Sequence, residues 1–136
     1  MAAMPLEMIE ARSLTSRLTT SSFLVDREGT LVYFNDAAAE LLGISFEEAG
    51  PMESGTWGTR FRPREPSGRE LPVGELPLAV AVQSGRPGFA RMRITSADGT
   101  DHEIEVTAFP IIGAGDQVGS IAIFWPVPED ESVDGD

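Results

Sequence analysis

Few residues of this chain have the types and spacing that chemistry requires. The 136 residues include no cysteine and one histidine, His102. Without thiols there is no disulfide, thiol nucleophile or thiolate metal site, and one histidine cannot build a multi-histidine zinc centre. The acidic residues Asp26, Glu28 and Glu40 have the setting of ordinary turn and helix residues, and no serine–histidine–aspartate or paired-carboxylate pattern is evident. We therefore expect no enzymatic activity and no metal.

The net charge limits the possible partners. The formal charge is −12 at pH 7, and the carboxylates near the C-terminus predict an acidic disordered tail over residues 128–136, with a docking segment for a basic partner as the alternative. The same charge repels phosphate backbones, so nucleic acid is not expected as a partner. The apolar runs are far shorter than the ~20 residues that cross a bilayer, and the N-terminus does not resemble a secretory signal. We predict a cytoplasmic protein with no membrane contact.

The first third of the chain predicts a helix and a hairpin. Two β-rich runs, 23–25 and 31–34, are separated by a charged link that ends at Gly29, which is a hairpin signal. Residues 5–18 precede them and predict a modest amphipathic helix. Its apolar stripe consists of Leu6, Ile9, Leu14 and Leu18.

Short helices and a loop are expected next. Asn35 or Asp36 can cap a helix that ends at Gly43, and residues 45–48 form a capping box for another short helix. Residues 52–74 are rich in glycine, proline and charge, and this composition predicts a long loop.

The last part of the chain predicts a buried helix followed by three strands. Residues 77–84 begin with proline and are apolar on nearly all sides, so this helix should be buried. The strands are expected over 89–95, 102–111 and 118–125. Two strands in front and three behind suit one five-stranded antiparallel sheet with helices covering one face, an α+β domain.

Charge pairing predicts the register of the hairpin around Gly99. A three-residue loop with Gly99 in the left-handed region places Arg91 opposite Glu105 and Met92 opposite Ile104. A two-residue loop would instead place Met92 opposite Glu105. The first register matches unlike charges and apolar side chains, so we prefer it.

Four segments of the chain resemble parts of a PAS domain. The family's first hairpin, asparagine and alanine-rich helix correspond to FLVDREGTLVYFNDAAAELLGIS. The buried helix of a PAS subgroup common in bacterial sensor proteins corresponds to GRELPVGELPLAVAVQSGRPG, its central hairpin to ITSADGTDHEIEVTAFPI, and its last strand to GDQVGSIAIFWPV. The resemblance covers residues 20–127 and leaves residues 1–19 as an N-terminal helical extension. A cystatin-like small barrel is the structural alternative.

The resemblance implies strand order 2-1-5-4-3, a cup between the sheet and its helices, and sensing or partner binding rather than catalysis. Fold alone does not fix the ligand. The light-sensing flavin and yellow photoreceptor subgroups attach their pigments through cysteine, which this chain lacks. The haem subgroup takes its axial histidine from the buried helix, but residues 77–84 contain none. We expect His102 at an exposed or edge position and Met92 in the core, no cofactor and a colourless protein. Non-covalent flavin is left open.

The cup should be apolar. In this family the residue before the asparagine points inward, which implies Phe34, and alternation along the strands extends the set. The pocket candidates are Phe23, Val25, Val32, Phe34, Leu41, Leu42, Leu76, Val80, Met92, Ile94, Ile104 and Val106. Such a cup suits an acyl chain or an aromatic molecule. The alternative is a filled core, which would leave a protein–protein interaction module without a ligand.

The last strand is apolar on both faces and needs cover on both. One face belongs to the cup, and the other needs the leading helix or a second copy of the chain. The interface candidates are Leu6, Ile9, Leu14, Leu18, Ile121, Ile123 and Trp125. The sequence thus predicts a non-enzymatic sensory module that forms a homodimer, takes a small apolar ligand and passes its signal to a partner protein.

Overall fold

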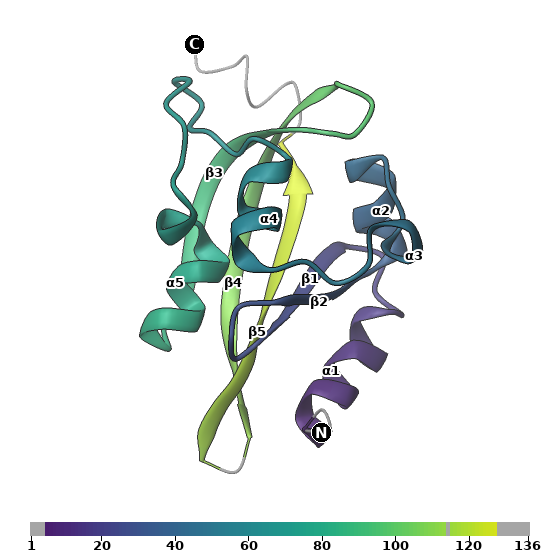
Figure 1. Cartoon of the computed structure of the whole chain (residues 1–136), viewed down its shortest axis with the longest axis vertical. Helices are drawn as coiled ribbons and strands as arrows, with labels where there is room; N and C mark the ends of the chain where they lie inside the picture. Colours follow the sequence, from purple (N-terminus) through teal and green to yellow (C-terminus); the bar gives the residue numbers. More distant parts are fainter. Residues whose placement is uncertain (1–4, 114, 128–136) are drawn as a thin grey trace.

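The five strands pair as antiparallel neighbours in the order β2-β1-β5-β4-β3, as predicted (Figure 1). The computed structural model describes residues 5–113 and 115–127, so the acidic tail predicted over 128–136 lies outside the described residues. The strands are β1 (Ser21–Asp26), β2 (Leu31–Phe34), β3 (Gly88–Thr95), β4 (Asp101–Gly113) and β5 (Asp116–Pro126).

Helices cover both faces of the sheet, in two separate layers. They are α1 (Leu6–Thr15), α2 (Asp36–Leu42), α3 (Phe46–Ala49), α4 (Ser54–Arg60), the 3₁₀ turn η1 (Val73–Glu75) and α5 (Pro77–Ser84). Residues of α2 to α5 share the main core with the inner face of the sheet. Residues of α1 share a smaller cluster with the outer face. The fold is therefore α+β with short helices on one face and a flanking N-terminal helix on the other.

The predicted caps set the helix ends. The Asn35 side chain accepts a hydrogen bond from the Ala38 N–H at the start of α2, and Gly43 ends that helix with a φ of 78°. The Ser45 side chain accepts from the Glu48 N–H at the start of α3. Glycine tolerates the left-handed backbone that such a helix end requires, whereas other residues are strained there.

The predicted register of the β3–β4 hairpin is confirmed. Arg91 lies opposite Glu105 and Met92 opposite Ile104, and Gly99 has a φ of 87°. The Arg91 guanidinium lies 2.7 Å from the Glu105 carboxylate. Unlike charges and apolar side chains therefore face each other across this hairpin, on opposite sides of the sheet.

The prediction of a long loop over 52–74 is wrong in part, because the segment contains α4. Its residues have modest helix propensity and include Gly55 and Gly58. Tertiary contacts offset that weakness, since the Trp57 side chain is buried in the main core and its indole N–H donates to the Gly29 carbonyl at 2.9 Å. The leading helix is also shorter than the expected 5–18, ending at Thr15.

A bulge changes the alternation of β2. Leu24 lies opposite Tyr33 and Val25 opposite Leu31, so Val32 is an extra residue between two pairs. Leu31 consequently joins the main core, whereas Val32 and Tyr33 pack in the cluster under α1. Strict alternation back from Phe34 predicted that Val32 faces the cup. This prediction is wrong, because the bulge turns Val32 to the outer face of the sheet.

Candidate ligand pocket

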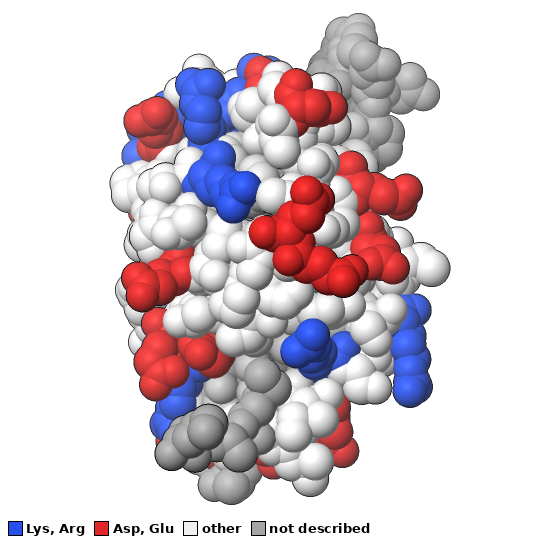
Figure 2. Space-filling model, turned by 45° about the vertical axis from the view of Figure 1, so that its right-hand side comes forward, with Lys and Arg blue, Asp and Glu red and all other residues white. Residues whose placement is uncertain are grey.

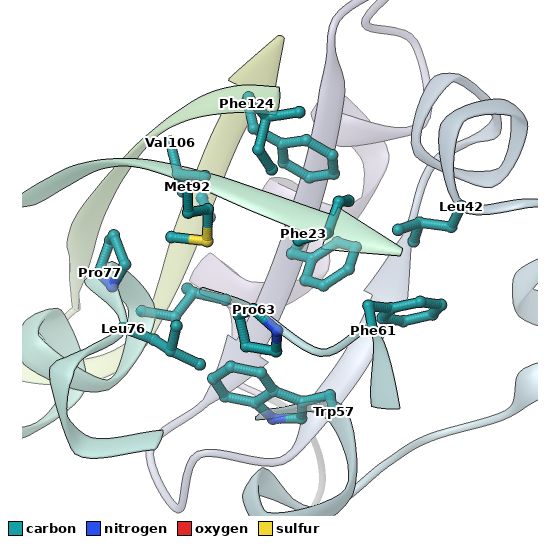
Figure 3. A pocket seen from close by; sticks show the side chains of 14 residues that line it. Phe23, Leu42, Trp57, Phe61, Pro63, Leu76, Pro77, Met92, Val106 and Phe124 are labelled. Atoms are coloured by element: carbon teal, nitrogen blue, oxygen red, sulfur yellow. The ribbon is translucent and has the colours of Figure 1, made fainter. Parts of the chain in front are cut away.

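A cavity of about 70 Å³ lies between the inner face of the sheet and the helices. Its lining residues come from the end of α2, the α4 segment, the start of α5, and strands β1, β3, β4 and β5 (Figure 3). They are Phe23, Leu42, Trp57, Phe61, Pro63, Leu76, Pro77, Leu78, Met92, Ile94, Ile104, Val106, Ala122 and Phe124.

Local structure explains why the helical walls face inward. Pro77 occupies the first turn of α5, where a missing N–H is tolerated. A side-chain carbon at Gly88 would lie 2.9 Å from the Pro77 carbonyl oxygen, so the glycine lets α5 approach the start of β3. On the opposite side, the Trp57 hydrogen bond to Gly29 fixes α4 over the β1–β2 turn. The start of α5 and the middle of α4 are thus each fixed by a close contact with the sheet or its first turn.

The structure brings part of the predicted pocket set together. Seven predicted residues line the cavity: Phe23, Leu42, Leu76, Met92, Ile94, Ile104 and Val106. Val25 and Phe34 are buried in the main core, with Leu41 packed against it, but none of these lines the cavity. Val80 is half-buried on α5 outside the lining set, and Val32 lies on the other face of the sheet.

Apart from Pro77 and Leu78, which belong to the predicted buried helix, the lining residues missed at the sequence level fall into two groups. Trp57, Phe61 and Pro63 belong to the segment predicted as a loop. Ala122 and Phe124 belong to β5. Ile123 lies between them and faces outward, so alternation along the strand already placed these two residues on the inner face of the sheet. The signal for this second group was therefore present in the sequence.

The walls of the cavity offer apolar contact and almost no polar contact. The Trp57 indole N–H is the one N–H or O–H group among the lining side chains, and Gly29 already accepts it at 2.9 Å. A cavity that binds benzene in an engineered protein has a volume of about 150 Å³. At about 70 Å³, the cavity has room for a few apolar heavy atoms.

These residues do not fit the cofactors that the fold family implies. The polar edge of a flavin ring needs hydrogen-bond partners, and burying it against unpaired apolar walls is unfavourable. The lining set contains neither histidine for haem nor cysteine for a covalent pigment. His102 lies half-buried on β4, opposite Ile94. Among residues 5–113 and 115–127, no group of three or more histidine, cysteine or acidic residues is arranged to hold a metal ion.

The outer face of the sheet is covered only in part. Met8, Ala11 and Thr15 form the face of α1 that points at the sheet, and Met8 packs with Leu24 and Val118. A side-chain carbon at Gly119 would lie 2.5 Å from the Met8 sulfur, so the glycine makes room for this contact.

The interface candidates lie around this partial cover. Leu6, Ile9 and Leu14 point away from the sheet and are exposed by 52–64%. Leu18 is half-buried beyond the end of α1, as are Ile121 and Ile123 on β5. Trp125 is 39% exposed, and its indole N–H donates to Glu105 at 3.1 Å. Phe89 and Phe109 are also exposed, and the pairing of β3, β4 and β5 places them on this same face.

An antiparallel sheet in the order β2-β1-β5-β4-β3, with helices enclosing an apolar pocket, defines the class of small sensory domains. A PAS domain family model matches residues 19–125. The chain therefore belongs to the PAS domain family, and the predicted family and fold are confirmed. By sequence, no curated protein matches it.

Solved structures give the same fold. The PAS domain from Bordetella pertussis BvgS is similar at 17% identity and a TM-score of 0.61, with 93% of this chain and 90% of that chain covered. The Rhodobacter sphaeroides LOV protein has a TM-score of 0.71 at 17% identity, covering 93% and 70% of the two chains. The PAS domain of an HTR-like protein from Haloarcula marismortui has a TM-score of 0.60 at 14% identity, covering 88% and 90%. At these identities the likeness concerns the fold alone. No helix of the described residues is long and apolar enough to span a membrane.

Proposed function

We propose that this chain is a non-enzymatic PAS sensory module that binds a small apolar ligand in the cup and signals as a homodimer. The observation that carries the proposal is the cavity of about 70 Å³, whose lining side chains offer no free polar group. A bound water needs two to four polar partners, which these walls do not offer, so the pocket favours apolar molecules. A short alkyl chain or part of a small ring suits the walls and the volume.

The ligand test uses 1-propanol and 1-pentanol as probes, because their alkyl chains are narrow and short. Binding is followed by the NMR signal of the Met92 methyl group, which belongs to a cavity-lining residue. We expect saturable shifts in the native protein and none in Val106→Phe, which fills the cavity. Circular dichroism and thermal unfolding check that the variant is folded, and Val106→Ile serves as a smaller filling variant. Native mass spectrometry and an absorption spectrum of freshly purified protein test for a resident ligand.

The alternative function is an interaction module whose core is closed. The exposed apolar residues of the outer face, such as Phe89 at 65% exposure, favour that reading. Absence of saturable shifts with both probes, together with a ligand-free mass, would replace the sensory proposal with this one.

The homodimer proposal concerns the outer face of the sheet and α1. Exposed apolar patches of this kind usually mark interfaces, and two-fold packing is the commonest way to bury one. Light scattering of the intact protein at micromolar concentration should give a dimer mass, and Ile123→Asp and Ile9→Asp should give monomers. Ile112→Asp is the control, because Ile112 is exposed but is not among the interface candidates. A monomer mass for the native chain would contradict the homodimer and would favour a partner protein as the molecule that covers the outer face.

A further inference from the structure

The lining of the cavity is unevenly shielded from solvent. Of its fourteen lining residues, thirteen are buried and Phe23 alone is half-buried. Figure 3 shows Phe23 on the same side of the cavity as Leu42 and Phe61, away from Leu76 and Pro77. Leu42 is the last residue of α2, and Phe61 directly follows α4. The cavity therefore comes nearest to solvent at the Phe23 ring, between the ends of these two helices.

The two residues that flank Phe23 are held by the same end of β3. The Leu42 carbonyl oxygen accepts from the Ala97 N–H at 2.7 Å, and the Phe61 carbonyl oxygen accepts from the Thr95 N–H at 2.7 Å. Thr95 is the last residue of β3, and Ala97 lies in the turn that follows it. Moving the end of α2 or α4 away from the sheet would break one of these bonds and leave its backbone groups unpaired.

The Phe23 backbone is fixed as well, which leaves its side chain as the part that can move. Strand β1 lies between β2 and β5, and Phe23 is paired with Phe34 on one side and with Ala122 on the other. The ring itself is held by aromatic contacts, at centroid distances of 5.5 Å to Phe34 and 5.2 Å to Phe124. A side chain changes rotamer by rotation about single bonds, so the ring can swing without unpairing a strand.

A second boundary of the wall, between α4 and η1, is closed by tight packing. Trp57 and Leu76 line the cavity on the two sides of this boundary. A side-chain carbon at Gly58 would lie 2.5 Å from Val73 Cγ2, so the glycine lets Val73 rest directly on α4. Val73 is half-buried and does not line the cavity. This boundary is therefore the less open route to the pocket, and Val73 provides a matched control.

The side of the molecule that carries α2 and α3 also has uncharged surface. Figure 2, in which this side comes forward, shows uncharged atoms between the acidic side chains near the centre and the basic side chains at the upper left. An apolar molecule that crosses such a surface does not have to strip water from charged groups, which would be costly.

We propose that the Phe23 ring is the gate of the pocket, which swings aside to admit an apolar ligand and then closes over it. This inference rests on the proposed function, because it needs the cavity to bind a ligand. With both flanks tied to β3 and the boundary at Val73 tightly packed, rotation of this one side chain is the smallest change that opens the cavity. A gate lies on the path of entry and of exit, so it limits both rates.

The experiment measures how fast 1-propanol and 1-pentanol exchange with the full chain, using the NMR signal of the Met92 methyl group. Phe23→Leu removes the ring and keeps an apolar side chain, whereas Val73→Ala loosens the other boundary. We expect Phe23→Leu to raise the association and dissociation rates about tenfold each, so that the dissociation constant changes much less than either rate. Val73→Ala should keep the native rates. Circular dichroism checks folding, and Phe23→Met replaces Phe23→Leu if that variant is unfolded.

A second measurement reports access to the pocket without a bound ligand. The chain has two tryptophans, Trp57 and Trp125, so Trp125→Phe leaves Trp57 in the pocket wall as the only one. In that background, quenching of the Trp57 fluorescence by acrylamide should increase in Phe23→Leu and should not increase in Val73→Ala.

The outcomes separate this inference from the proposed function. If the alcohols bind but Phe23→Leu leaves both rates unchanged, or if Val73→Ala accelerates exchange as much, the gate is wrong and the apolar pocket stands. Quenching of Trp57 that does not increase in Phe23→Leu also overturns the gate. If neither alcohol binds, the pocket proposal fails and the gate fails with it.

Discussion

The buried side chain of Asn35 joins α1, β1 and α2, and its replacement is the most informative test of the fold. The Nδ2 group donates to the carbonyl oxygens of Thr15 at 3.0 Å, Thr20 at 2.9 Å and, more weakly, Leu18 at 3.4 Å. The Oδ1 atom accepts from the Ser22 N–H at 3.1 Å and the Ala38 N–H at 3.0 Å. One amide thus satisfies backbone groups of three segments.

The expected loss for Asn35→Ala follows from these partners. Loss of the cap on α2 lowers the free energy of unfolding by about 0.5–2 kcal/mol. The fully buried Ser22 is left with an N–H that has lost its acceptor, which costs about 1–3 kcal/mol more. With the Thr15 and Thr20 carbonyls also losing a donor, we expect a total of about 3–5 kcal/mol, a large part of a typical stability of about 5–15 kcal/mol.

Urea denaturation measures this loss. The control is Ser45→Ala, which removes the exposed cap bond of 3.2 Å and the exposed 3.3 Å bond from the hydroxyl to the Glu48 carboxylate, and should lower the free energy of unfolding by about 0.5–1 kcal/mol. Limited proteolysis within α1 should also accelerate in Asn35→Ala but not in the control, because α1 loses its tie at Thr15. A loss in Asn35→Ala no larger than that in Ser45→Ala would refute the reasoning.

Asn35→Asp sharpens the test, because it keeps the acceptor atom and removes the donor. An ionised carboxylate facing three carbonyl oxygens is unfavourable, so the pKa of the new carboxyl should be higher in the folded state than its unfolded value of about 3.9. The proton is then held more tightly by the folded chain, so stability is greatest below that unfolded value and falls as the pH rises through the folded one. A variant whose free energy of unfolding is independent of pH between 4 and 7, relative to the native chain, would contradict this account of the Asn35 environment.

Three further predictions test the pocket and the outer face. Val106→Ile should raise the free energy of unfolding by up to about 1 kcal/mol, because the added methyl group fills part of the cavity. Val25→Ile adds the same group in the fully buried core away from the cavity and should lower the free energy of unfolding by about 1–3 kcal/mol. Equal shifts of the two variants in thermal unfolding would argue against the cavity. The Arg91 hydrogen bond lowers the pKa of Glu105, so the native chain should lose stability as the pH falls below about 4.3. In acid denaturation, Glu105→Gln should reduce the dependence of the free energy of unfolding on pH in that range. Trp57→Phe removes the donor to a turn carbonyl and should lower the free energy of unfolding by about 1–3 kcal/mol, measured by urea; no change would mean that packing alone holds α4.

Local rules predicted much of the fold because they act within a few residues. Gly29, Gly43 and Gly99 each have a left-handed backbone, where glycine avoids the strain that a side chain would bring. The Arg91–Glu105 pair fixed the β3–β4 register, since a shift by one residue would have sent every side chain to the other face. Each of these signals is visible in a short stretch of sequence, without knowledge of the rest of the chain.

The features that the sequence did not reveal depend on distant contacts. Helix α4 has weak propensity and forms where Trp57 meets the β1–β2 turn, 28 positions away in sequence. The bulge at Val32 depends on how β2 pairs with β1, and alternation within β2 alone cannot show it. The pocket wall contributed by Phe61 and Pro63 was missed for the same reason as α4.

Strand β5 is one of the elements through which the pocket and the outer face are physically connected. Phe124 lines the cavity and contacts the ring of Phe23 at a centroid distance of 5.2 Å, while the adjacent residues Ile123 and Trp125 point to the other face. A sheet is one backbone thick, so a ligand that displaces Phe124 also displaces the peptide units that position its neighbours. Closely packed cores transmit such shifts rather than absorb them. If the outer face is the dimer interface, its geometry therefore depends on the neighbours of residues that contact the ligand. A signal from the pocket to the interface then needs to cross only one strand.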